Sequence, residues 1–141
     1  MSAAHPVESI VVAAAVVERD GTFLVTRRLA GTHLAGRWEF PGGKQLPGES
    51  LEKCLVREIR EELACLVDVG HCLVSTTHDY PERRVTLHFF ACRLLGEPVP
   101  QDGQAMRWVA RQDLSELDLP EADRELVELL VAGAPSADAE G

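Results

Sequence analysis

The first third of the chain alternates between short apolar runs and turns, a pattern typical of β-strands. The apolar run 10–17 is rich in β-branched residues and alanine, and it ends at the polar segment 18–21. Because Asp-Gly between two apolar runs is a strong hairpin signal, we expect a returning strand at 22–26. Residues 29–37 contain two glycines and few large apolar side chains, which predicts a loop, and 38–40 predict a short strand.

Two segments carry apolar residues at the spacing of an α-helix. Over 50–63, every fourth residue from Leu51 is apolar, and Ser50 before them is a good N-cap, so we expect a helix there. A second amphipathic helix is expected at about 121–132, directly after Pro120, with several leucines on one face.

Between the two helices the pattern changes to that of extended chain. The segments 67–80 and 83–95 are separated by a short turn, and the second alternates apolar and polar positions. Residues 96–104 predict a loop, and 106–110 a short strand. A mixed sheet with helices on its faces is therefore expected, an α/β (α+β) sandwich.

Composition limits the classes of protein. A chain of 141 residues predicts one domain, over 1–133, followed by a flexible tail at 134–141. Acidic residues outnumber basic ones by 23 to 14, giving a net charge of −9, which argues against polymeric nucleic acid and anionic membranes as partners. The longest apolar run, 10–17, has eight residues, against the roughly 20 of a membrane helix.

The cysteines and the N-terminus indicate the compartment. Cys54, Cys65, Cys72 and Cys92 show no C-x-x-C spacing, which favours buried free thiols in a reducing cytoplasm. The N-terminus lacks the basic region of a secretory signal. We expect a cytoplasmic protein, and no feature of the sequence requires more than a monomer.

Three carboxylates dominate the first predicted helix. At 100° per residue, Glu58, Glu61 and Glu62 form one acidic ridge beside the apolar stripe. Like charges this close repel, and burial raises the cost of ionised carboxylates, so a hard divalent cation such as Mg²⁺ would relieve them. The alternative is a solvated acidic face paired with Arg57 and Arg60. Before the helix, the adjacent Gly42 and Gly43 would allow a ligand to approach the backbone closely.

The segment 43–65 resembles the Nudix box, G-x5-E-x7-R-E-U-x-E-E-x-G-U, where U is a bulky aliphatic residue. The positions that match are Gly43, Glu49, Arg57, Glu58, Ile59, Glu61 and Glu62. Two positions depart from the pattern: Ala64 stands in place of glycine and Cys65 in place of an aliphatic residue. A left-handed conformation at Ala64 would cost roughly 1–2 kcal/mol.

Other segments are similar to the MutT branch of the Nudix superfamily in order and spacing. They are residues 26–28, His33, 38–44, 80–83 and 102–104. The resemblance implies a Nudix α/β/α sandwich with a mixed sheet. It also implies an enzyme, an acid anhydride hydrolase that converts (deoxy)nucleoside triphosphates to the monophosphate and pyrophosphate by attack of water on the β-phosphorus.

The same resemblance implies roles for individual residues. The metal, Mg²⁺ with Mn²⁺ as a possible substitute, would be held by Glu58, Glu61, Glu62 and the Gly42 carbonyl. Arg57 would orient Glu58, and Glu49 would steady the box. Glu58 and Asp102 are both candidates for the general base, and Arg28 and Lys44 for binding phosphates.

Recognition of the base would fall to residues from several segments: Arg28, His33, Glu39, Phe40, Pro41, Gly42, Tyr80 and Asp123. The position of Asp123 is a neutral amide in members specific for oxidised guanine. We expect an 8-oxo-dGTP diphosphatase that cleanses the nucleotide pool, which would serve DNA replication and repair. An ionised Asp123 only accepts hydrogen bonds, which instead suits the amino group of CTP or a modified dCTP. A Nudix-fold binding module without catalysis is a third hypothesis.

Overall fold

The structure is a computed structural model that describes residues 8–27 and 36–133. It contains seven strands: β1 (Glu8–Arg19), β2 (Thr22–Arg27), β3 (Trp38–Glu39), β4 (Gly42–Lys44), β5 (Val67–Tyr80), β6 (Arg83–Leu94) and β7 (Met106–Ala110). Its α-helices are α1 (Leu51–Leu63) and α2 (Arg124–Val131), and its 3₁₀ helices are η1 (Arg111–Glu116) and η2 (Glu121–Asp123). The predicted tail lies outside the described residues.

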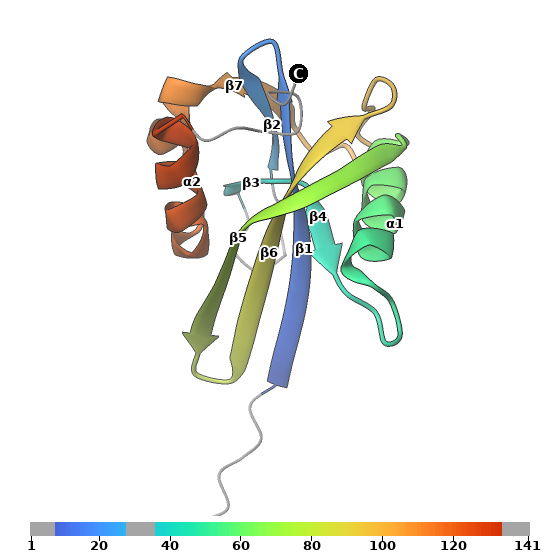
Figure 1. Cartoon of the computed structure of the whole chain (residues 1–141), viewed down its shortest axis with the longest axis vertical. Helices are drawn as coiled ribbons and strands as arrows, with labels where there is room; N and C mark the ends of the chain where they lie inside the picture. The colour runs from blue at the N-terminus through green and yellow to red at the C-terminus, as the bar shows by residue number, and fades with distance from the viewer. Residues whose placement is uncertain (1–7, 28–35, 134–141) are drawn as a thin grey trace, which may run out of the picture.

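The strands form one mixed sheet. Its main order is β3-β2-β1-β6-β5, with β4 paired to β1 and β7 paired to β2. The pairing of β1 with β6 is parallel, and that of β5 with β6 is antiparallel. The helices α1 and α2 lie on opposite sides of this twisted sheet (Figure 1). The expected sandwich with a mixed sheet is confirmed.

Alternation along β1 divides the core into two clusters. Ala13 and Ala15 pack with the apolar stripe of α1, whereas Ala14 and Val16 pack with the leucines of α2. Successive side chains of a strand point to opposite faces, so this one strand contributes to both layers. Neither helix in the described ranges is long and apolar enough to cross a membrane.

The helix α1 begins and ends as its sequence predicts. Ser50 caps it, because the Ser50 hydroxyl accepts a hydrogen bond from the Lys53 backbone N–H at 3.1 Å. At the other end Ala64 adopts the left-handed conformation, with φ 51° and ψ 40°. This is the strained geometry that the missing box glycine predicted.

Three sequence predictions need correction. Gly42–Lys44 forms strand β4, and an added Cβ at Gly42 would lie 2.1 Å from the Ala13 carbonyl oxygen, so the close approach expected of a ligand is made there by β1. The second helix starts as the 3₁₀ turn η2, and only Arg124–Val131 is α-helical. Cys72 is exposed, while the other three free thiols are buried.

Candidate active site

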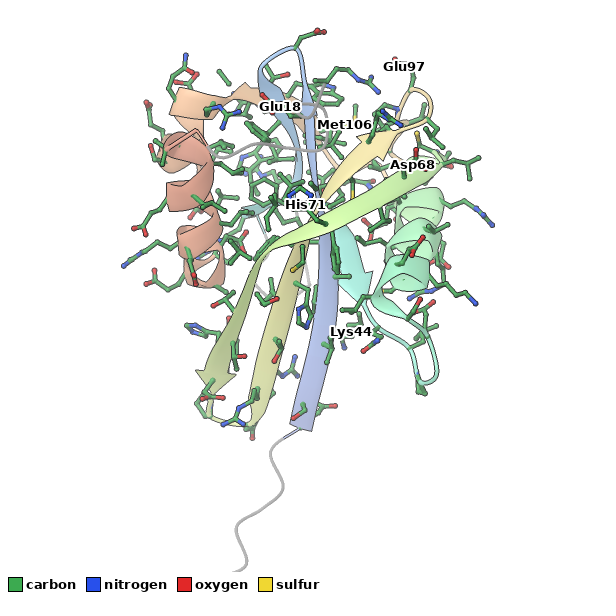
Figure 2. The ribbon with its side chains drawn as sticks, viewed as in Figure 1. Glu18, Lys44, Asp68, His71, Glu97 and Met106 are labelled. Atoms are coloured by element: carbon green, nitrogen blue, oxygen red, sulfur yellow. The ribbon has the colours of Figure 1, made fainter. Side chains whose placement is uncertain are left out.

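A cleft of about 640 Å³ lies on the face of β1 and β6 that carries Val12 and Leu87. Residues from β3, β4, α1, the loop before β7 and η2 complete its walls. Figure 2 shows Lys44 beside β4, at the foot of the α1 side of the molecule. Glu58 and Glu62 line the cleft near α1, and Asp123 lines it near η2. Acidic side chains therefore occupy both ends of one cleft.

Arg57 organises the carboxylates at the α1 end. Its Nε donates to Glu49 Oε2 at 2.7 Å and its Nη2 to Glu49 Oε1 at 3.0 Å, a bidentate pair. Its Nη1 donates to Glu58 Oε1 at 2.9 Å, and its Nη2 also donates to the Lys44 carbonyl at 3.0 Å. The bonds from Arg57 lower the pKa of Glu49 to about 2. Arg57 thus joins the segment before α1, strand β4 and the helix itself.

The three glutamates of the predicted ridge differ in their exposure and in whether they line the cleft. The Glu58 side chain is 15% exposed and lies over Gly43, where an added Cβ would come 2.4 Å from the Glu58 carboxyl carbon. The Glu61 side chain is 60% exposed and accepts from Arg57 Nη1 at 3.2 Å. Glu61 is not among the residues that line the cleft. Glu58 and Glu62 are the ridge members that face it.

Glu62 is the least compensated of these carboxylates. Burial raises its pKa well above the usual value, and the neighbouring carboxylate of Glu58 raises it further. The charges of Glu39 and Asp102, which also line the cleft, add to this effect. Glu62 is therefore stable as an anion only with a cation beside it, and otherwise it binds a proton.

The loop between β6 and β7 brings Asp102 to the cleft. The Gln101 backbone N–H donates to the Glu62 carbonyl at 2.9 Å, and the Val99 N–H donates to the Leu63 carbonyl at 2.8 Å. These bonds satisfy two carbonyl groups at the end of α1, where intrahelical partners run out. Asp102 is thereby held close to the carboxylates of α1 although it lies far from them in sequence.

The other end of the cleft is apolar around one buried carboxyl group. Asp123 is 4% exposed, and its side chain makes no capping hydrogen bond to α2. Burial, and secondarily the charge of Glu39, raises the pKa of Asp123 to about 7. Phe40 meets Phe89 edge-to-face with ring centroids 6.1 Å apart. This end combines aromatic surface with a carboxyl group that titrates near neutrality.

Most of the predicted site residues lie together. Those that line the cleft are Glu39, Phe40, Gly42, Lys44, Glu58, Glu62, Tyr80, Asp102 and Asp123. Arg57 and Glu61 stand behind the cleft, and the Pro41 carbonyl accepts from the Ala15 N–H at 2.7 Å in the pairing with β1. Arg28 and His33 lie outside the described residues.

Several lining residues had no role in the sequence analysis. They are Thr26, Arg27, Arg83 and Gln104. Arg27 ends β2 and Arg83 begins β6, so their place at the cleft depends on how strands from distant segments pair. Gln104 lies two residues after Asp102, in a segment that the sequence analysis noted only for its resemblance.

The acidic set is open rather than a closed metal cage. Within 8–27 and 36–133, no three His, Cys, Asp or Glu side chains are grouped so as to hold a metal ion by themselves. Mg²⁺ is commonly bound by one or two carboxylates together with substrate phosphates and water, and not by an all-protein cage. The pair Glu58 and Glu62, with Asp102 across from it, fits that mode of binding.

Comparison with known proteins agrees with this arrangement. The NUDIX domain family model matches residues 12–129. The chain is 37% identical over 124 residues to the CTP pyrophosphohydrolase of Escherichia coli K12, covering 87% of this chain and 92% of that protein. It is 33% identical over 109 residues to the 8-oxo-dGTP diphosphatase of the same organism, covering 77% and 84%.

A solved structure gives the same result. The crystal structure of a MutT NUDIX hydrolase from Burkholderia pseudomallei has a TM-score of 0.77 and 28% identity, covering 86% of this chain and 97% of that one. The chain therefore belongs to the NUDIX domain family, as a MutT-like Nudix hydrolase. The resemblance seen in the sequence is confirmed.

Proposed function

We propose that this chain hydrolyses (deoxy)nucleoside triphosphates to the monophosphate and pyrophosphate, with Mg²⁺ as cofactor and 8-oxo-dGTP as preferred substrate. The observation that carries the proposal is one cleft with Glu58 and Glu62 at one end and the buried Asp123 at the other. A nucleotide fits these two ends, because its phosphate chain is charged and its base is uncharged. Relatives named for 8-oxo-dGTP and for CTP support the reaction class.

At the phosphate end, Arg57 alone does not balance the carboxylates and the phosphates of a nucleotide, so a metal cation is needed there. Glu58, Glu62 and the Gly42 carbonyl are the proposed metal ligands, with Glu61 joining them from its exposed position. When bound, Mg²⁺ would neutralise phosphate charge and acidify a water molecule. Arg57 fixes the Glu58 carboxylate through the 2.9 Å bond, and Lys44 at the edge of β4 is placed to bind phosphate. Arg28 is a further proposed phosphate ligand.

Two carboxylates are candidates for the general base that takes a proton from the attacking water. Glu58 is oriented by Arg57 through the 2.9 Å hydrogen bond to its carboxylate. Asp102 faces the cleft from the loop before β7. Either group can accept the proton as water attacks the β-phosphorus, because both line the cleft beside Glu62.

The nucleobase end favours a base that offers both a donor and an acceptor. With a pKa of about 7, Asp123 carries a proton in a large fraction of molecules at neutral pH. A carboxylic acid can donate one hydrogen bond and accept another, which matches the O6 acceptor and the N7–H donor of 8-oxoguanine. Phe40 and Tyr80 supply aromatic surface in the same cleft. Glu39 and His33 are the remaining proposed contacts.

A specific observation also favours a second candidate, hydrolysis of CTP or a modified dCTP. When ionised, Asp123 only accepts hydrogen bonds, which suits the N4 amino group of cytosine. The match to the relative named CTP pyrophosphohydrolase covers 92% of that protein.

The test is pyrophosphate release from dGTP, 8-oxo-dGTP, CTP, dCTP and 5-methyl-dCTP, with Mg²⁺ and then with EDTA. We expect EDTA to abolish release and 8-oxo-dGTP to have the highest kcat/KM. A higher kcat/KM for the cytosine nucleotides would establish the second candidate. No release from any nucleotide would overturn both and leave a binding module.

The setting of the reaction follows from the substrate. Preference for 8-oxo-dGTP would give the protein a role in sanitising the nucleotide pool before DNA replication. Four free thiols favour the cytoplasm as its compartment, and we propose that it acts there as a monomer.

A further inference from the structure

The side chain of Gln104 connects the two segments that carry the carboxylates of the phosphate end. Its Nε2 donates to the Glu62 carbonyl at 3.3 Å. Its Oε1 accepts from the Asp102 backbone N–H at 2.8 Å. Both halves of one amide are therefore used, one toward the last turn of α1 and the other toward the loop before β7.

This connection lies at the C-terminal end of α1. Ala64 ends α1 in a left-handed conformation that disfavours any residue with a Cβ. The Glu62 carbonyl accepts from the Gln101 N–H as well as from Gln104. The geometry between Glu62 and Asp102 is thus determined by the loop and not by the helix alone.

We infer that Gln104 is a positioning residue for the hydrolysis, setting the separation between the carboxylates of Glu62 and Asp102. The inference rests on the proposed function, in which both carboxylates face the phosphates. Gln104 itself needs no contact with the substrate. A primary amide suits the task because it supplies a donor and an acceptor about 2.3 Å apart on one rigid group.

Two substitutions separate the halves of the bridge, and a third is the control. Gln104→Ala removes both hydrogen bonds. Gln104→Glu retains an acceptor for the Asp102 N–H but cannot donate to the Glu62 carbonyl when ionised. The control is Gln101→Ala, which removes an amide of the same exposed loop whose Nε2 donates only to the Val99 carbonyl, at 2.7 Å.

The first measurement is hydrogen exchange of the Asp102 backbone amide by NMR in the metal-free protein. Exchange should become faster in Gln104→Ala, and remain near the wild-type rate in Gln104→Glu and Gln101→Ala. This readout depends on the bridge alone and not on any reaction. Unchanged exchange in Gln104→Ala would overturn the inference.

The second measurement is kcat and KM with the best nucleotide of the panel, per folded molecule. Outer partners of catalytic carboxylates typically contribute about 10- to 100-fold, so kcat should fall by that factor in Gln104→Ala while KM changes little. Gln101→Ala should match the wild type. Equal kcat in the two alanine variants would overturn the inference, whereas an inactive wild type would overturn the proposed function itself.

Discussion

The carboxylates around Arg57, beside the α1 end of the cleft, and the buried Asp123 at its η2 end are held in opposite ways. At the α1 end, Arg57 supplies a positive charge to Glu49 and Glu58, and the pKa of Glu49 falls to about 2. At the η2 end, Asp123 is buried against apolar side chains and near Glu39, and its pKa rises to about 7. The same side chain type is thus fixed as an anion at one end and poised to bind a proton at the other.

Glu62 shows that position along the cleft is not the deciding factor. It lies at the α1 end, yet the hydrogen bonds of Arg57 to carboxylates go to Glu49, Glu58 and Glu61. Burial, and secondarily the neighbouring Glu58, raises the pKa of Glu62, as burial raises that of Asp123. The contrast with Glu49 therefore comes from burial without a compensating cation, since Arg57 lowers the pKa of Glu49. Where the chain provides no such cation, a ligand has to supply the missing charge or proton.

The largest effect should come from Glu58→Gln, which removes the charge from the carboxylate that Arg57 presents to the cleft. Loss of a charged group that serves the metal or the water is worth several kcal/mol in the transition state. We expect kcat/KM to fall by at least about 100-fold, with the circular dichroism spectrum unchanged. Glu52→Gln, an exposed change on the first turn of α1, is the control and should keep full activity.

Glu61→Gln sharpens the comparison, because Glu61 shares the Nη1 group of Arg57 with Glu58 but does not line the cleft. If Glu61 binds the metal as proposed, this variant also loses turnover while it remains folded. An active, metal-dependent Glu61→Gln would contradict that role and restrict the metal ligands to the carboxylates that line the cleft. Pyrophosphate release over a range of Mg²⁺ concentrations measures both.

Arg57→Ala should leave the carboxylates at the α1 end without a cation, like Asp123 at the η2 end. The loss of Arg57 leaves Glu49, 14% exposed, and Glu58 without their cation, and frees the Lys44 carbonyl. Because these ion pairs and the bond to the Lys44 carbonyl are lost together, we expect a clear fall in Tm, which thermal unfolding measures. Arg57→Lys keeps the charge but cannot form the bidentate pair, so its Tm should lie between the two. Equal Tm values for wild type and Arg57→Ala would contradict this account.

Asp123→Asn tests the opposite end. The folded-state pKa of about 7 lies above the ordinary aspartate value of 3.8, so between about pH 4 and 7 the folded protein keeps a proton that the unfolded chain has released. The contribution of Asp123 to the free energy of unfolding is therefore most favourable below pH 4 and declines as the pH rises to 7. The asparagine variant lacks that decline, and we expect it to gain roughly 4 kcal/mol at pH 8 relative to its gain at pH 3.5.

Denaturant unfolding of both proteins at the two pH values measures this difference. A stability gain of Asp123→Asn that is equal at pH 3.5 and 8 would rule out titration as its cause. The same variant also tests base selection, because an amide both donates and accepts. If the wild type prefers cytosine nucleotides, Asp123→Asn should move the preference toward 8-oxo-dGTP.

Local patterns of the sequence predicted the α1 end better than the η2 end. The limits of α1, its Ser50 cap and the left-handed Ala64 all follow from neighbouring residues, and the structure confirms them. The helical period of 100° per residue placed Glu61 with Glu58 and Glu62, but this period says nothing about partners elsewhere in the chain. Arg57, anchored on Glu49 and on the Lys44 carbonyl, donates to Glu61 as well as to Glu58, and only Glu58 of these two lines the cleft.

The features that the sequence did not predict depend on distant segments. Strand β4 has three residues, two of them glycine, so it carries no periodic signal, and its partner β1 lies some thirty positions earlier. The start of the second helix as η2 and the burial of Asp123 depend on packing against the sheet. Gln104 became visible as a bridge only when its bonds to Glu62 and Asp102 were known.

The smallest effect is expected from Ala64→Gly, which tests how far the α1 end depends on its own helix terminus. Ala64 has φ 51°, where glycine avoids the Cβ penalty, so the glycine variant should be more stable by about 1 kcal/mol. Denaturant unfolding measures this gain. Because the carbonyls of Glu62 and Leu63 are already held by Gln101 and Val99, the positions of the carboxylates should not change. We therefore expect kcat/KM within about twofold of wild type, as for a surface change of this size. A large rise in kcat/KM would mean instead that strain at Ala64, and not the loop, sets the geometry of the phosphate end.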